Sequence, residues 1–155
     1  MKWDCSIDIN APIEIVWDLF DERHPKRIMP KVDSNEWIVQ NEPLTGSSYK
    51  QTYREGKRTE TYLVTITEFK DEPEEKTKSI QFVLANLFET NLTFEMQKLA
   101  DSRTQFRYVG SNEGINLMAK TMLKLGKKQE NGGPVVAEFM DRVKQEAEKD
   151  AKGSE

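Results

Sequence analysis

Four tyrosines are the side chains of this chain whose type and spacing could bind or act on a small molecule. Tyr49, Tyr53, Tyr62 and Tyr108 fall in segments where apolar and polar residues alternate, which is typical of strands with one buried face. A hydroxyl that faces an apolar interior needs a hydrogen-bond partner, which a ligand oxygen, water or another side chain can supply. The tyrosines are therefore candidate ligand contacts.

Side chains suited to nucleophilic or acid–base catalysis are few. His24, the single histidine, lies between Arg23 and Pro25 in a polar connection, which favours a position at the surface or at a cavity mouth. The sequence contains no nucleophile elbow, metalloprotease motif, glycine-rich phosphate loop or paired histidines. Cys5 alternates with polar residues, which favours packing in a strand over a role as a nucleophile. These features favour a protein that is not an enzyme.

Composition argues against several classes of partner. One cysteine and one histidine cannot form an intramolecular disulfide or a zinc cluster, so we expect no disulfide, no metal and no cofactor. The formal net charge of −4 argues against nucleic-acid binding, which needs a basic surface. No apolar run approaches the roughly 20 residues that span a bilayer, and charges occupy the N-terminal segment where a signal peptide would be apolar. We expect a cytoplasmic protein, and the sequence leaves its oligomeric state open.

The periodicity predicts an α+β fold with an antiparallel sheet. Alternation over residues 3–9 predicts a first strand that ends near Asn10, and a helical stripe over 13–20 follows it, with a brief second turn over 24–29. The pattern then changes to period two and predicts strands at 36–40, 49–53, 59–69, 80–84, 92–96 and 106–108. Residues 71–75 are predicted to form an acidic loop. Short connections indicate antiparallel pairing.

An amphipathic helix over residues 134–149 is the predicted cover of this sheet. Its apolar residues recur at three- and four-residue steps: Val136, Phe139, Met140, Val143 and Ala147. Pro134 after Gly132 and Gly133 fits the first turn of a helix.

The segment between the last strand and this helix is expected to form a second helix or a lid. Its apolar stripe consists of Ile115, Met118, Met122 and Leu125, and it carries Lys120, Lys124, Lys127 and Lys128. We expect one domain over residues 1–150 and a frayed polar tail over 151–155.

The stretch SIDINAPIEIVWDLFDE resembles the opening of the START-like or SRPBCC superfamily, in which a first strand runs into a helix with an A-P-x-x-x-V-W motif. Here the matching positions are Ala11, Pro12, Val16, Trp17 and Leu19-Phe20. The most similar members are bacterial proteins of the polyketide cyclase/dehydrase-like group. The resemblance implies a helix-grip fold, in which a curved antiparallel sheet of about six to seven strands wraps around a long C-terminal helix over an apolar cavity. The Gly-Gly-Pro break at residues 132–134 departs from this pattern. It implies that the lid and the terminal helix are two pieces, where some relatives have one long helix.

The inward positions predict a lining rich in aromatic residues, which could equally be only a packed core. The candidate ligand-binding residues are Tyr49, Tyr53, Tyr62, Ile66, Phe82, Leu84, Phe94, Met96, Phe106, Tyr108, Met122, Val136, Phe139 and Met140.

The favoured function is binding or transport of a small hydrophobic molecule, such as a lipid, an isoprenoid or an aromatic metabolite. One alternative is a polyketide cyclase/dehydrase-like enzyme that uses Tyr53 or Tyr108 for proton transfer. Another is a protein-interaction module, like the family members that act on the heat-shock chaperone. The methionines and lysines of residues 118–128 also raise contact with an anionic membrane as a less favoured idea.

Overall fold

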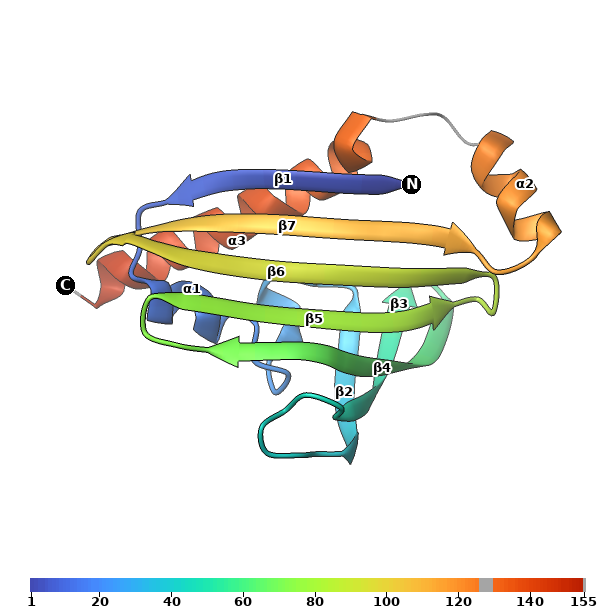
Figure 1. Ribbon diagram of the computed structural model, residues 1–155, viewed down its shortest axis with the longest axis horizontal. Coiled ribbons are helices and arrows are strands. Elements are labelled where there is room, and N and C mark those ends of the chain that lie inside the picture. The colour runs from blue at the N-terminus through green and yellow to red at the C-terminus, as the bar shows by residue number, and fades with distance from the viewer. Residues whose placement is uncertain (126–129, 155) are drawn as a thin grey trace.

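The computed structural model describes residues 1–125 and 130–154, shown in Figure 1. The elements in chain order are β1 (Lys2–Ile9), α1 (Ile13–Asp18), the 3₁₀ turn η1 (Pro25–Arg27), β2 (Val32–Val39), β3 (Ser48–Glu55), β4 (Arg58–Asp71), β5 (Glu75–Leu84), β6 (Phe88–Ala100), β7 (Arg103–Gly114), α2 (Leu117–Leu125), the 3₁₀ turn η2 (Glu130–Gly132) and α3 (Gly133–Gly153).

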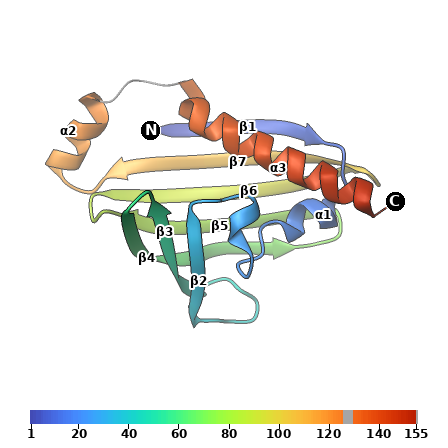
Figure 2. The same cartoon turned by 180° about the vertical axis from the view of Figure 1, so that it is seen from behind.

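The strands form one antiparallel sheet of seven strands in the order β1-β7-β6-β5-β4-β3-β2. Figure 2 shows β2 and β3 running at a steep angle to β6 and β7, so the sheet is strongly curved, with α3 lying across β1 and β7 on its concave side. We call this side the inner face. The predicted helix-grip architecture is confirmed.

Several strands are longer than the sequence predicted. β2 begins at Val32 instead of residue 36, and β5 begins at Glu75 instead of residue 80. The start of β5 reads as polar because Lys76 and Lys78 occupy inward positions, and both lysines are buried. An alternation test that treats lysine as outward-facing cannot detect such a segment.

The predicted face of the terminal helix is confirmed. Val136, Met140, Val143 and Ala147 are buried, and Phe139 is half-buried against them. α3 continues to Gly153, so residues 151–153 belong to the helix and not to a frayed tail. Arg27 of η1 donates hydrogen bonds to Asp150 and Glu146, and so connects the last turns of α3 to the α1–η1 corner.

α2 confirms the helix expected after the last strand, but Met118 and Met122 of its predicted apolar face do not pack on the sheet. Met118 is 61% exposed and Met122 is 50% exposed. Among residues 117–123, whose side chains the structure describes, Ala119 alone is buried, because α2 lies so close to Gly114 that a Cβ there would come within 2.5 Å of the Lys120 backbone nitrogen. Contact through this small residue turns the methionines outward. Lys127 and Lys128 lie outside the described residues, as do the side chains of Lys124 and Leu125.

Asn131 covers part of the free edge of β1. The Asp4 backbone N–H donates to the Asn131 Oδ1 at 2.9 Å, and the Asn131 Nδ2 donates to the Asp4 carbonyl at 3.2 Å. The side-chain amide thereby pairs with β1 as a neighbouring strand would, which protects an edge that could otherwise pair with another chain. This contact fixes the start of α3 against the first strand.

Candidate binding site

The structure brings together most of the predicted lining residues and leaves three apart. Eight belong to the buried core: Tyr49, Ile66, Phe94, Met96, Phe106, Tyr108, Val136 and Met140. Tyr62, Phe82 and Phe139 are partly buried against that core. Tyr53, Leu84 and Met122 are not part of it, so the expectation that they line a common cavity is not met.

Tyr53, Met122 and Leu84 lie outside the core for different reasons. The Tyr53 hydroxyl donates to Glu55 on its own strand, at the exposed end of β3. Met122 points to solvent because α2 contacts the sheet through Ala119. Leu84 lies at the β5–β6 turn, where Ala85 and Asn86 have positive φ angles and reverse the chain.

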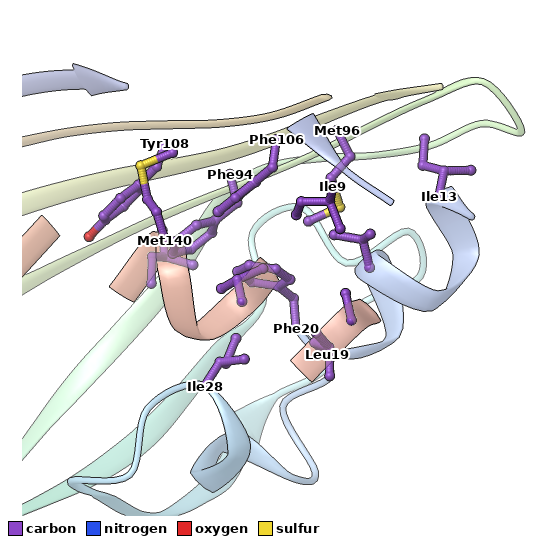
Figure 3. Close-up of a cluster of buried hydrophobic side chains, with 14 of the residues drawn as sticks. Ile9, Ile13, Leu19, Phe20, Ile28, Phe94, Met96, Phe106, Tyr108 and Met140 are labelled. Atoms are coloured by element: carbon purple, nitrogen blue, oxygen red, sulfur yellow. The ribbon is translucent and has the colours of Figure 1, made fainter. Parts of the chain in front are cut away.

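One end of the inner face is filled by an aromatic cluster formed by Phe20, Phe94, Phe106, Tyr108 and Phe139, of which Figure 3 labels all but Phe139. The rings of Phe94 and Tyr108 stack with centroids 5.3 Å apart, and Tyr108 lies 4.9 Å from Phe139. Phe20, from the turn after α1, lies 4.8 Å from Phe94. Rings at these separations leave no room for a ligand among them. Phe94, Met96 and Phe106 are therefore core residues, and not a cavity wall.

The other end of the inner face carries partly exposed aromatic side chains. Tyr62 of β4 and Phe82 of β5 stack with centroids 4.8 Å apart and an interplanar angle of 19°. Both rings, and Leu92 of β6, are only partly buried against the core. This end therefore offers aromatic surface that another apolar molecule could cover.

Strands β4 and β5 separate beside this stack. Their pairing ends at Thr65 and Gln81, and beyond that point a pocket of about 510 Å³ lies between residues 60–65 and residues 81–89. Successive residues of a strand point to opposite faces, yet Tyr62 and Leu63 both line this pocket. The pocket must therefore lie at the strand edges, where it connects the two faces of the sheet. We call it the strand opening.

Glu60 also lies in the strand opening. Its Oε1 accepts a hydrogen bond of 2.6 Å from the Ala85 backbone N–H. The carboxylate thus replaces a missing backbone contact where the two strands separate. Glu60 shares the alternation phase of Tyr62, which is the sequence signal that could have identified it as a site residue.

A hydrogen-bonded chain of polar side chains supports the tyrosine of the stack. The Tyr62 hydroxyl donates to Gln51 Oε1 at 2.8 Å, and Gln51 Nε2 donates to Asn35 Oδ1 at 2.9 Å. Asn35 Nδ2 in turn donates to the Glu22 carbonyl. The chain fixes the orientation of the Tyr62 ring relative to β2 and β3. Gln51 and Asn35 were not predicted as site residues.

Lys78 is a buried cation that sequence reasoning missed. Its Nζ donates to the Phe20 carbonyl and to Glu22 Oε1, both at 2.6 Å, and lies 5.5 Å from the centre of the Trp17 ring. These contacts satisfy the ammonium group, so it serves to anchor the α1 corner to β5. The same alternation that placed Ile80 and Phe82 inward also applies to Lys78.

Three inner tyrosines have hydroxyl groups with raised pKa values. Burial raises the pKa of Tyr49, Tyr62 and Tyr108 well above the usual tyrosine range. For Tyr49 the nearby carboxylate of Glu22 raises the pKa further. All three hydroxyls therefore keep their protons at neutral pH.

The α1–η1 connection holds three potential metal-ligating side chains. Ligand atoms of Asp18, Asp21 and His24 lie within 4.8 Å of one another. Arg23 already donates to both carboxylate oxygens of Asp21, and this contact lowers the pKa of Asp21 to about 2. A cation would have to compete with the guanidinium, so the group does not make a convincing metal site. His24 is exposed, as its sequence context predicted.

A second pocket, of about 500 Å³, lies between β1 and α3 and is lined by Cys5, Ile7, Met140 and Lys144 among others. The Cys5 thiol donates to the Asn131 carbonyl at 3.6 Å.

In the described part of the chain, no helix combines the length and the apolar composition needed to cross a bilayer.

Comparison with solved structures places this arrangement in the START-like, helix-grip class. A START superfamily protein from Mycobacterium smegmatis matches with a TM-score of 0.68 and 10% identity, over 99% of each chain. The Zhui aromatase/cyclase from Streptomyces matches with a TM-score of 0.68 and 14% identity, over 98% of this chain and 93% of that chain. Norcoclaurine synthase from Thalictrum flavum, solved with dopamine and hydroxybenzaldehyde, matches with a TM-score of 0.61 and 13% identity, over 94% of this chain and 84% of that chain.

The chain therefore has the START-like fold that its first strand and helix predicted. No family model and no curated protein matches the sequence. At identities of 10% to 14% the similarity concerns the fold, and the function has to be argued from the site.

Proposed function

We propose that this protein binds a small hydrophobic molecule, without transforming it, against the partly exposed end of the inner face. The observation that carries the proposal is the Tyr62–Phe82 stack, which is open to solvent beside the strand opening. Covering apolar surface contributes about 25 cal/mol per Å², and an exposed aromatic pair offers a planar molecule a matching surface. The structural neighbour crystallised with two small aromatic molecules supports the same class of ligand.

A catalytic role has less support. Tyr53 and Tyr108, which an enzyme of the cyclase type would use, have raised pKa values, so their protonated hydroxyls cannot abstract protons near neutral pH. The buried ammonium of Lys78 is occupied by Glu22 and a backbone carbonyl. Binding needs none of these groups to change protonation state.

A protein-interaction role is the second candidate, and the surface of α2 favours it. Leu117, Met118 and Met122 are 81%, 61% and 50% exposed, which is unusual for large apolar side chains on one short helix. A partner protein that covers this helix would explain their exposure. The two roles predict different results in the same experiment.

The first test is native mass spectrometry of the purified protein compared with its denatured mass. Retention of a noncovalent small molecule is the expected result, followed by thermal stabilisation with compounds of the same class. The Phe82→Ala variant is expected to weaken binding at least threefold, because it removes half of the aromatic stack.

Leu99→Ala is the matched control. Leu99 is 43% exposed on β6, away from the stack, so its truncation removes a comparable exposed apolar group without touching the inner face. A ligand-free mass, with no thermal shift from fatty acids, sterols, flavonoids or aromatic polyketides, would contradict the binding proposal and favour the interaction role.

A further inference from the structure

The strand opening has a negatively charged lining. Glu60 and Glu89 both belong to it, and the described residues that line it include no lysine, arginine or histidine. A carboxylate on a bound molecule would be repelled by these two side chains, whereas a positive charge would be attracted. The opening therefore favours a cation over an anion.

Glu60 is the carboxylate on the same face of the sheet as the aromatic stack. One residue separates it from Tyr62 on β4, so both side chains point to the same face. Glu89 pairs with Val83, the neighbour of Phe82, and therefore lies on the opposite face. The Glu60 carboxylate is close enough to Tyr62 to add to the rise in pKa that burial causes. A molecule that covers the stack has Glu60, and not Glu89, on its own side of the sheet.

The Glu60 carboxylate keeps one oxygen available to a ligand. Its Oε1 accepts from the Ala85 N–H at 2.6 Å, which fixes the carboxylate where the strands separate. Its Oε2 lies 3.7 Å from Arg58 Nη2, which is too far for a hydrogen bond. The Arg58 side chain is 76% exposed, whereas that of Glu60 is only 20% exposed. A single available oxygen suits one N–H donor, such as an ammonium group, better than the paired donors of a guanidinium.

We propose that the molecule bound in the strand opening is a cation, with a planar apolar group on the Tyr62–Phe82 stack and a protonated amine at Glu60 Oε2. This assignment rests on the proposed binding function and adds the charge of the ligand. Two residues of a strand span roughly 7 Å, so a short alkyl chain between the ring and the nitrogen covers the distance from Tyr62 to Glu60. The apolar group supplies most of the affinity, and the amine supplies the selectivity.

Three compounds with one aromatic group test the charge: 2-(1-naphthyl)ethylamine, its neutral N-acetyl derivative and 3-(1-naphthyl)propionate. Their affinities for the full chain are measured by isothermal titration calorimetry at pH 7 and low salt. The amine is expected to bind about threefold more tightly than the acetamide, and the carboxylate is expected to bind most weakly. Added salt should reduce the difference between the amine and the acetamide, because the opening is in contact with solvent.

Glu60→Gln separates charge from structure, because glutamine keeps an oxygen that can accept from the Ala85 N–H. This variant is expected to lower the ratio of amine to acetamide affinity by about threefold to tenfold and to leave the acetamide affinity unchanged. Glu36→Gln is the matched control, since Glu36 also lies near one basic side chain, Lys50 at 3.6 Å, but on the exposed surface of β2. An equal fall of the ratio in the two variants would contradict a contact with Glu60.

Arg58→Gln should act in the opposite direction. Its guanidinium is the protein's own cation beside Glu60 Oε2, so its removal is expected to strengthen binding of the amine by about twofold without affecting the acetamide. Weaker binding of the amine to this variant would contradict the proposed contact.

Two results distinguish failure of this inference from failure of the proposed function. Equal affinities of the amine and the acetamide for the wild-type protein, or an unchanged ratio in Glu60→Gln, would overturn the cationic ligand and leave the proposed function standing. Failure of all three compounds to bind the wild-type protein would overturn both.

Discussion

At the scale of single residues, the interior of this protein depends on buried polar side chains with specific partners. Lys78 and Glu22 are both almost fully enclosed, with side chains 7% and 10% exposed. Breaking a buried ion pair is strongly destabilising, because the remaining charge loses its compensation. The Lys78–Glu22 pair therefore stabilises the packing of the segment after α1 against β5.

Lys78→Met is expected to lower the free energy of unfolding by about 3 kcal/mol or more, because it leaves the Glu22 carboxylate and the Phe20 carbonyl without their donor. The measurement is urea unfolding at pH 7. Lys50→Met is the control, since Lys50 also pairs with a glutamate, Glu36, but at an exposed site and at 3.6 Å. Lys50→Met should change the free energy of unfolding by no more than about 0.5 kcal/mol. Equal losses in the two variants would contradict the role assigned to Lys78.

At the scale of elements, a charged contact between distant parts of the chain connects η1 to α3. The Arg27 guanidinium donates to both carboxylate oxygens of Asp150 and to Glu146. Hydrogen bonds from Arg27 hold the pKa of Asp150 below its usual value. A carboxyl group with a lowered pKa in the folded state stabilises the fold above its unfolded pKa, and this contribution is lost as the pH falls through the folded pKa.

Arg27→Gln is therefore expected to lower the free energy of unfolding by about 0.5–1 kcal/mol at pH 7. The loss is small because Arg27 and its carboxylate partners are partly exposed. The difference from wild type should shrink once the pH falls below about 4, the usual aspartate pKa, as the carboxylates become protonated in both proteins. Urea unfolding at a series of pH values measures it. Lys57→Gln, in the exposed β3–β4 turn, should show no such trend. A loss that is the same at every pH would show that the contact does not act through these carboxylates.

At the scale of the whole molecule, α3 is held on the curved sheet by the aromatic cluster. Phe139 contributes the ring from α3, and it lies within 6.5 Å of Phe20, Phe94, Phe106 and Tyr108, measured between centroids. This one side chain joins the helix to β6, to β7 and to the end of α1. Phe139 is therefore the α3 side chain through which the helix packs on the aromatic cluster.

Phe139→Ala is expected to lower the free energy of unfolding by about 3 kcal/mol, through lost burial and the cavity that remains. Thermal and urea unfolding measure the loss, and near-ultraviolet circular dichroism should show weaker aromatic signals. Val135→Ala on the same helix is the control, because Val135 is 75% exposed. A loss below about 1 kcal/mol would mean that α3 is held mainly by its other buried residues.

The sequence by itself determined the local elements and, through the Ala11-Pro12 and Val16-Trp17 motif, the class of fold. It also determined the buried face of α3, because helical periodicity repeats over enough residues to be unambiguous. The inward phase of each strand followed in the same way from alternation, which is why most of the candidate lining residues are near one another.

Only the tertiary structure decided which inward residues are core and which are open. Phe94 and Phe82 have the same sequence signature, but Phe94 is covered by Phe20 and Phe139, whereas Phe82 lies beside the point where β4 and β5 separate. The separation of β4 from β5 and the outward orientation of Met122 depend on contacts between distant segments, such as Ala119 against Gly114. Local periodicity carries no information about such contacts, because it records only which way a side chain points.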